Sequence, residues 1–334
     1  MSYVLPHADY RVTLDGVDLT DRLRPRLEAL TLTERRGDEA DRLEIVIEDT
    51  DGRFALPSPG KLLHVQIGWL RGSDVPVGLV DKGSFKVDEV EHGGPPDVIT
   101  LRASSADFTS RIVTRREQSW RDTTIGAVVK MVAARNGLEP RCAAALASVA
   151  LPTLHQSRES DMALLRRLGR EYDAVATVKR GSLIFARVGA GVTSSGKAIP
   201  ALTFARGEGD THSYRLEKRG DVAGVSASWH DRGAATKKTV IAGEEGGARH
   251  LSRVYPTERA ARAAADAALS RSRRQPASLD LTPAYGRPDI YPERKVNVRG
   301  FKPEIDARSW LVAEVSHTLD GTGGLSSRIK LETT

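Results

Sequence analysis

The chain has a single cysteine, Cys142, among its 334 residues. One thiol cannot form an internal disulfide, so the fold must be stable without covalent cross-links and suits assembly in a reducing cytoplasm. No apolar run approaches the ~20 residues that a membrane-spanning helix needs. The first six residues have neither the basic region nor the apolar core of a signal peptide. We therefore expect no membrane anchor and no Sec-dependent export.

Aromatic residues are also scarce, at 5% of the chain against 40% hydrophobic residues. The core must therefore be packed mainly by Val, Leu, Ile and Ala, as in many globular proteins. The length predicts two or three domains of ~100 to 150 residues. A net charge of +6 permits nucleic-acid binding, but the basic residues are dispersed among 44 acidic ones, so nucleic acid is not an expected partner.

Common motifs of catalysis and cofactor binding are missing. Neither His-x-x-x-His nor Gly-x-Ser-x-Gly occurs, so Trp229-His230-Asp231 sets an imidazole beside a carboxylate without a nucleophile on a defined turn. Gly189-Ala190-Gly191 lacks the third glycine of a dinucleotide loop, because the next glycine is Gly196. We assign no catalytic, cofactor-binding or metal-ligating residue and do not expect an enzyme.

The segment Glu48-Asp49-Thr50-Asp51-Gly52 begins like a calcium loop, because carboxylates two residues apart can share one cation. Arg53 stands at the fifth position of that loop, and no glutamate follows at the twelfth. We interpret the segment as a turn stabilised by Asx side chains. The basic stretches 111–116 and 271–274 could contact phosphates, but arginines in the last turn of a helix also favour its negative dipole end.

What the sequence does contain is one pattern used twice. Residues 85–92 and 310–317 both read aromatic-x-Val-x-Glu-Val-x-His, and each copy is followed by paired glycines, Gly93-Gly94 and Gly323-Gly324. The match extends outward on both sides: residues 63–69 match 295–301 upstream, and residues 99–101 match 329–331 downstream. Such repetition predicts two copies of one β-domain with an insertion between them. The alternative is that hairpins rich in Val and Gly resemble one another.

In each copy of the pattern, apolar residues occur at both odd- and even-numbered positions. Phe85 and Val87 lie on one face of a regular strand and Val90 on the other, and Trp310, Val312 and Val315 repeat this arrangement. The strands must therefore contain a bulge or be buried on two sides. The matched histidines, His92 and His317, are interpreted as structural residues at a strand end.

Short strands without intervening helices are expected over the first hundred residues, which favours a sandwich or barrel. The expected strands are 10–14, 17–20, 27–33, 43–48, 62–69, 85–91 and 98–103. Between about 106 and 190 the period becomes helical. One helix is capped by Asp122 or Thr123, a second runs from Asp161 to Tyr172 after Ser160, and a hairpin covers 174–188.

The small polar residues of 189–200 predict a connector. Strands are expected again at 213–218 and 221–229, and an Ala-rich helix at 257–274. The predicted domains are a first β-domain at 1–105, a helix-containing α/β insert and linker at 106–200, and a second β-domain with the Ala-rich helix at 201–334. The fold class is β-rich α+β.

Taken together, these residues resemble the phage late control D family, the central baseplate hubs of contractile tails and related injection machines. The sequence departs from that pattern at Asp173, where relatives often carry Gly. The segment Glu159-Ser160-Asp161 is similar to a helix entry in the hub portion of type VI secretion spike proteins. The matching stretches are 43–45, 49–52, 83–91, 94–97, 118–120, 156–161, 164–168, 286–289, 300–301, 305–306, 310–319 and 323–324.

The resemblance implies a homotrimer in which each chain supplies two antiparallel β-barrels similar to the tail-tube subunit, giving a pseudo-six-fold ring. Such a trimer would join the hexameric tail tube to the trimeric spike. The implied partners are the spike protein, the tube or tube-initiating protein, other baseplate proteins and the tape measure protein, with no cofactor. The implied location is the virion tail baseplate of a phage or phage-like particle, assembled in the bacterial host cytoplasm. No appended spike or lysozyme-like segment is recognised.

Two other functions stay open. A tail-associated cell-wall hydrolase or protease would show a carboxylate with a raised pKa in a cleft. A basic DNA-binding tail protein would require a clustered positive face.

Overall fold

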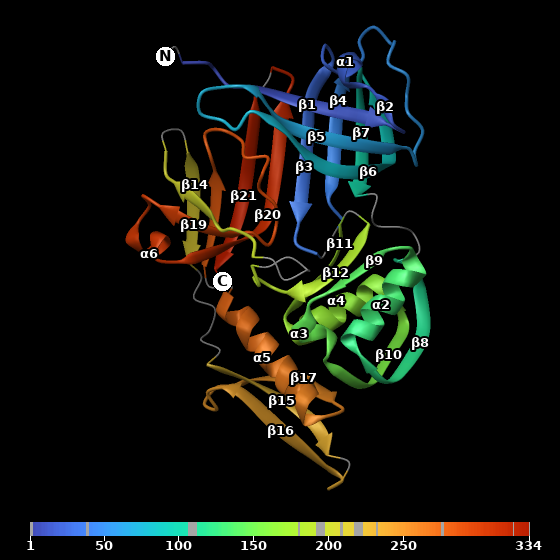
Figure 1. Ribbon diagram of the computed structural model, residues 1–334, viewed down its shortest axis with the longest axis vertical. Coiled ribbons are helices and arrows are strands. Elements are labelled where there is room, and N and C mark those ends of the chain that lie inside the picture. Colours follow the sequence, from blue (N-terminus) through green and yellow to red (C-terminus); the bar gives the residue numbers. More distant parts are fainter. Residues whose placement is uncertain are drawn as a thin grey trace.

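One large sheet organises the chain (Figure 1). The computed structural model describes residues 3–37, 40–105, 112–179, 181–191, 198–207, 210–216, 223–231, 233–274, 277–322 and 324–333. Within them, thirteen strands form a single sheet in the order β14-β18-β21-β20-β3-β4-β7-β6-β5-β1-β2, with β13 and β19 attached at β20. The sheet therefore combines strands from both ends of the chain.

The N-terminal part of the sheet contains the strands expected from the alternating pattern. Thr20, expected to end the strand 17–20, instead begins a short helix. The elements are β1 (His7–Leu14), β2 (Val17–Asp18), α1 (Thr20–Leu23), β3 (Leu27–Arg35), β4 (Arg42–Glu48), β5 (Leu62–Arg71), β6 (Gly78–Gly93) and β7 (Val98–Ser105).

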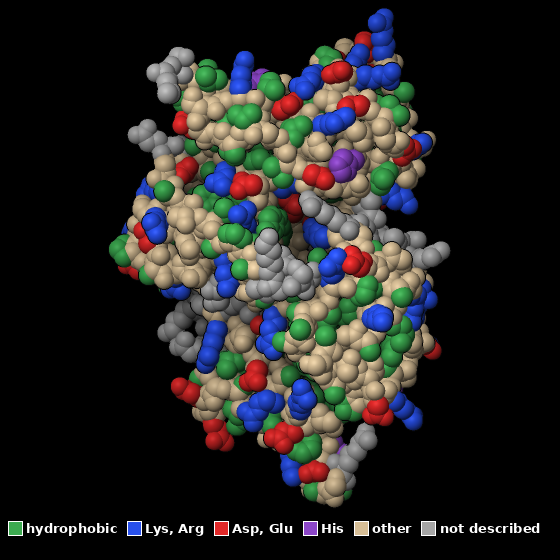
Figure 2. Space-filling view, in the orientation of Figure 1, with side chains coloured by type: hydrophobic (Ala, Val, Ile, Leu, Met, Phe, Trp, Pro, Cys, Tyr) green, Lys and Arg blue, Asp and Glu red, His purple; other side chains and the backbone are tan. Residues whose placement is uncertain are grey.

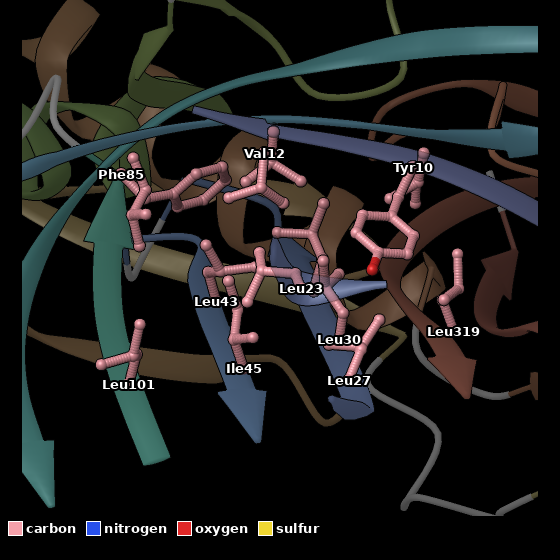
Figure 3. Close-up of a cluster of buried hydrophobic side chains, with 14 of the residues drawn as sticks. Tyr10, Val12, Leu23, Leu27, Leu30, Leu43, Ile45, Phe85, Leu101 and Leu319 are labelled. Atoms are coloured by element: carbon pink, nitrogen blue, oxygen red, sulfur yellow. The ribbon is translucent and has the colours of Figure 1, made fainter. Parts of the chain in front are cut away.

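This part of the sheet folds over its own core. Strand β6 is long enough to pair with β5 through its first half and with β7 through its second, and in Figure 1 β1 and β5 cross in front of β3, β4 and β7. Figure 3 shows Val12, Leu43 and Phe85 pointing into the shared interior. The strand pairs form an open path within the described ranges, and no closed ring is found among them.

The C-terminal part repeats this arrangement around a second core. Its strands are ordered β19-β20-β21-β18-β14, which corresponds strand by strand to β5-β6-β7-β4-β3 in the N-terminal part. Trp310, Val312 and Leu279 are fully buried there. The elements are β13 (Leu202–Ala205), β14 (Thr211–Leu216), β18 (Ala277–Thr282), β19 (Lys295–Arg299), α6 (Pro303–Asp306), β20 (Ser309–Asp320) and β21 (Leu325–Thr333).

The repeated pattern lies on β6 and β20, and it is bulged at the same place in both. The register of β6 against β7 shifts between Val87 and Glu89, and that of β20 against β21 shifts between Val312 and Glu314. An extra residue at a bulge moves the following side chains to the opposite face. The bulge therefore explains the apolar residues of both parities.

Both outer matches need a change of register. Upstream, Leu63 pairs with Phe85 and Val296 with Trp310, so Leu63 corresponds to Val296 and not, as the sequence suggested, to Lys295.

Downstream, Val90 pairs with Leu101, whereas Val315 pairs with Ile329. Leu101 therefore corresponds to Ile329 and not, as the sequence suggested, to Leu331. The shift is two residues, which leaves the same side chains facing the core.

The insert forms a third core. Its elements are β8 (Arg115–Thr124), α2 (Ile125–Asn136), β9 (Glu139–Cys142), α3 (Ala144–Ala147), β10 (Ala150–Ser160), α4 (Asp161–Tyr172), β11 (Ala174–Lys179) and β12 (Ser182–Arg187). The helix α4 is confirmed as expected. The cap of α2 is Thr124, not Asp122 or Thr123, and the antiparallel pair β8–β10 was not anticipated.

The entry of α4 is held by a buried carboxylate. Asp161 is fully buried and accepts hydrogen bonds from Arg135, Asn136 and Gln156 at 3.0–3.1 Å. The Ser160 hydroxyl accepts from the amide of Ala163 at 3.1 Å. Asp161 thereby ties α2, β10 and α4 together. The helix ends at Asp173, whose φ of 53° is the left-handed conformation that Gly adopts with less strain.

A fourth core lies in a lobe at the bottom of Figure 1. The helix α5 (Glu258–Arg274) packs on a small sheet of β15 (Gly224–Asp231), β16 (Thr236–Gly243) and β17 (Arg249–Tyr255). Connector residues 192–197, Gly323, Arg111 and the ends of the two strands expected at 213–218 and 221–229 lie outside the described residues. None of the helices in the described ranges is long and apolar enough to cross a membrane.

Replacing Asp161 by Ala is expected to destabilise the insert by about 3–5 kcal/mol, because the buried Asn136 and Gln156 would lose their acceptor and the partly buried Arg135 its counter-charge. Hydrogen exchange of peptides covering α4 measures this local loss. Ser160→Ala is the matched control, since losing a helix cap costs about 1 kcal/mol. Equal protection of α4 in the two variants would contradict the role given to Asp161.

Candidate functional site

The two halves of the large sheet meet where β3 pairs with β20. Seven consecutive residues of β20, from Glu314 to Asp320, pair antiparallel with residues 29–35. Leu319 of β20 is buried in the first core together with Leu325. The ion pair Arg35–Glu314, 2.8 Å long, crosses the same junction. This junction makes one continuous body of the two repeat units.

Behind the junction lies a buried polar cluster of Glu34, Lys82 and His317. The Lys82 ammonium is 2.6 Å from the Glu34 carboxylate and 3.1 Å from Nε2 of His317. It also donates to the carbonyl of Ile290 at 3.3 Å. The three side chains come from β3, β6 and β20, so the cluster forms only when the two units are joined.

The geometry decides how His317 is protonated. Because an ammonium group can only donate, Nε2 of His317 accepts from Lys82 and the ring proton lies on Nδ1. Nδ1 then donates to the hydroxyl of Ser327 at 2.7 Å. Burial, reinforced by the charge of Lys82, lowers the pKa of His317, although Glu34 opposes the shift. The histidine is therefore neutral in the folded protein.

Glu34 remains charged in this cluster. Burial alone would raise the pKa of its carboxyl, but the Lys82 ammonium 2.6 Å away outweighs that effect and holds the pKa below its usual range. A cavity of about 680 Å³ adjoins the cluster. It is lined by parts of both halves and by the insert, including Asp41, Lys179 and Pro288. Lys179 contacts Asp41 there, and so links the insert to the sheet.

The matched histidines of the repeat differ in their surroundings. The His317 side chain is fully buried, whereas that of His92 is 42% exposed and lies at the end of β6. His317 is in the interior of β20 rather than at its end. The expected place at a strand end is therefore wrong for His317, which is buried in the interior of its strand. Glu34 and Lys82 were missed, because neither stands out from other charged residues on alternating strands.

The segment that resembled a calcium loop is a turn. Asp49 accepts from the amide of Phe54 at 2.8 Å, and Asp51 accepts from the amide of Arg53 at 3.1 Å. The Arg26 guanidinium pairs with Asp51 and lowers the pKa of that carboxyl to about 2. The interpretation as an Asx-stabilised turn is confirmed. Among the described residues, no group of three His, Cys, Asp or Glu could hold a metal ion.

The candidate triad residues do not come together. Asp231 is held by Lys238 at 2.5 Å and by the amides of Gly233 and Ala234, whereas His230 is exposed. Two Ser–His contacts that the sequence did not reveal, Ser119–His155 and Ser226–His250, join residues directly opposite each other on paired strands.

The basic stretches are engaged within the chain. Arg116 lies 3.6 Å from Asp161, and Arg271 donates to the carbonyl of Arg170, which joins the lobe to the insert. Figure 2 shows acidic and basic side chains intermingled on the visible face, without one large basic area. Arg116 and Arg271 thus help to hold the fold together, whereas Arg115 and Arg273 are exposed.

Comparison with known proteins decides the family. A family model described as the phage tail baseplate hub (GPD) matches residues 44–322. The chain belongs to this baseplate hub family. The probable baseplate hub protein of Escherichia phage P2 is 39% identical over 96% of this chain and 92% of the relative. That of Escherichia phage 186 is 37% identical over 96% and 93%. The resemblance found in the sequence is confirmed.

Solved structures show that this hub protein has the fold of tail proteins. The 43 kDa tail protein of prophage MuSo2 from Shewanella oneidensis matches with a TM-score of 0.70 and 15% identity, over 97% of this chain and 98% of that one. The tail protein of Neisseria meningitidis MC58 matches with 0.70 and 16%, over 97% and 96%. The E. coli c3393 protein, a type VI secretion component, matches with 0.57 and 12%, over 97% and 76%.

The family gives the function: the protein is a hub of the phage tail baseplate, and hence a component of the virion. The fold agrees with this role, because it is β-rich and shared with tail proteins. The family description is structural and names no reaction.

Replacing Glu34 by Gln is expected to lower the free energy of unfolding by about 3–5 kcal/mol, because Lys82 would remain buried without its counter-charge. Urea unfolding measures the loss. Glu44→Gln, at an exposed ion pair on β4, is the control and should cost less than about 1 kcal/mol. Similar losses in the two variants would contradict the importance of the buried cluster.

Acidification is expected to destabilise the hub protein through His317. Above pH 6.5 the residue is neutral in both folded and unfolded chains. Below it the unfolded chain binds a proton that the folded chain resists, because the folded pKa is lowered. The contribution reaches at most about 2 kcal/mol at pH 5. We expect stability to fall less steeply between pH 7 and 5 in His317→Gln than in the wild type; identical slopes would argue against a neutral His317.

Proposed function

We propose that this hub protein is a trimeric symmetry adapter, which joins a hexameric tail tube to a trimeric spike. Three chains with two repeat units each present six similar units to the tube, while the assembly keeps the three-fold symmetry of the spike. Tube-initiating, tape measure and other baseplate proteins are further proposed partners. The particle would be assembled in the host cytoplasm.

The main observation that supports the adapter proposal is the duplication inside the large sheet. Strands β5-β6-β7-β4-β3 and β19-β20-β21-β18-β14 have the same order, and the second strand of each set, β6 or β20, is bulged after the same Val. The two sets lie side by side in one sheet. Two equivalent units at a fixed spacing in each chain are what a six-unit ring built from three chains requires.

The exposed surface supports a function based on interfaces. Leu70, Val77 and Leu79, at the hairpin between β5 and β6, are 51%, 62% and 37% exposed. Exposed apolar side chains that lie near one another are typical of surfaces that become covered in an assembly. We propose that the protein acts through such surfaces and catalyses no reaction.

The proposed domains are 1–105, 106–200 and 201–334. The first two are supported by separate cores, with the first core completed by Leu319 and Leu325 from the C-terminal part. The third contains two cores, one for the second β unit and one for the lobe of β15, β16, β17 and α5. Two tube-like barrels, one per β unit, remain part of the proposal.

The proposal predicts a particle of about three times 36.2 kDa in size-exclusion chromatography with light scattering. The measurement should be made with the hub protein alone and with its spike partner. A species that stays monomeric at high concentration and in the presence of the spike would contradict the adapter function.

A further inference from the structure

One half of β6 has a neighbour on only one side. Residues Glu89–Gly93 pair with β7, but the pairs of β6 with β5 end at Lys86. The matching half of β20, from Glu314 to Asp320, lies between β21 and β3. Within the described ranges, the second unit thus has a strand where the first unit has an open edge. Unpaired backbone groups at such an edge are a ready template for another strand.

Because β6 lacks this neighbouring strand, side chains on its open half are more exposed than their counterparts on β20. Val315 and His317 are fully buried in the second unit, whereas their counterparts Val90 and His92 are half-buried and exposed. A strand beside β6 would cover Val90 and His92 in the way that β3 covers Val315 and His317.

The strand that corresponds to β3 is β14, and its outer edge is also open. Among the described strands β14 pairs only with β18, and it ends the path of the large sheet. Its Leu216 is 59% exposed. In Figure 1, β14 and the end of β6 lie on opposite sides of the sheet. The two open edges therefore suit a head-to-tail contact between copies rather than a contact within one chain.

The strand pairings set the correspondence between β3 and β14. Leu32 is connected through Leu43 and Ala103 to Val87. Tyr214 is connected in the same way, through Leu279 and Leu331, to Val312. Because Val87 and Val312 hold the same position in the repeat, Tyr214 corresponds to Leu32.

We infer that the open edge of β6 pairs antiparallel with β14 of a second copy, in the register that β20 makes with β3. Leu32 pairs with His317, so Tyr214 of the second copy faces His92. Arg215 then faces Glu91, and Leu216 faces Val90. The inference rests on the proposed trimer, in which this contact repeats at each boundary between chains.

The charges on the two edges are complementary. Arg102 alone serves three carboxylates, Glu44, Glu89 and Glu91, at 3.1, 3.2 and 2.9 Å. Among the ion pairs of the described residues, this one guanidinium therefore faces three negative charges. Arg215 is exposed and makes no ion pair with a described residue.

The junction of β3 with β20 shows how negative charge at the equivalent position of β20 is neutralised. Glu314, the counterpart of Glu89, pairs with Lys330 on its own unit and with Arg35 from the strand across the junction. In the inferred register Arg215 takes the position of Thr33, opposite Glu91, and would supply a second cation to the acidic group on β6 from there. The apolar pair Val90–Leu216 lies beside it and would be buried on the opposite face.

Cysteine cross-linking tests the register. Residues directly opposite on paired strands have Cβ atoms close enough for a disulfide. In a Cys142→Ala background, we expect Glu91→Cys with Arg215→Cys to give covalent dimers and trimers under mild oxidation. The control, Glu89→Cys with Ser213→Cys, uses the same faces of the same strands. Its two positions differ from the proposed register by four residues, or ~13 Å, and should cross-link at least ~10-fold less.

The outcomes separate this inference from the adapter proposal. A trimer in light scattering without preferential cross-linking of 91 with 215 would overturn the strand pairing and leave the trimer standing. Absence of any trimer would overturn both.

Charge exchange gives a second, non-covalent test. Glu91→Arg and Arg215→Glu should each raise the concentration at which the trimer dissociates, and the double variant should restore it toward the wild-type value. Dissociation curves from light scattering at low salt measure this. Additive losses in the double variant would overturn the pairing of these two residues.

Discussion

The pairing of β3 with β20 is the contact on which the rest of the molecule depends. These strands are separated by most of the chain, yet their hydrogen bonds turn two repeat units into one sheet. The junction also brings Glu34 and His317 next to Lys82, so that charges which would be costly alone are buried with their partners. The spacing of the two units is therefore set by a ladder of backbone hydrogen bonds rather than by a flexible linker.

Much of the local structure could be predicted from short-range patterns. The helix α4 was found within its bounds because Ser160 is a strong cap and the apolar positions recur with helical spacing. Alternation located most strands of the first unit, and the mixed parity of Val87 and Val90 correctly indicated a bulge as one of two explanations.

The remaining features depend on contacts between distant segments. The pair β8–β10 has weak alternation, and its strands flank a helix, so it was read as part of a helical region. The register of the match downstream of the repeated pattern was wrong by two residues, because several registers place apolar residues on the same face. The polar cluster could not be predicted either, since Glu34, Lys82 and His317 become neighbours only through the order of strands in the sheet.

The lobe of β15, β16, β17 and α5 begins and ends at one point of the large sheet. It is inserted between β14 and β18, and the residues on its two sides, Leu216 and Ala277, are direct partners in the β14–β18 ladder. Paired strands are about 4.8 Å apart, so the chain leaves the sheet and returns to it one strand away. Evolution can therefore lengthen, shorten or exchange this lobe without altering the register of any other strand. Hubs with the same sheet could in this way adapt to different neighbours in the baseplate.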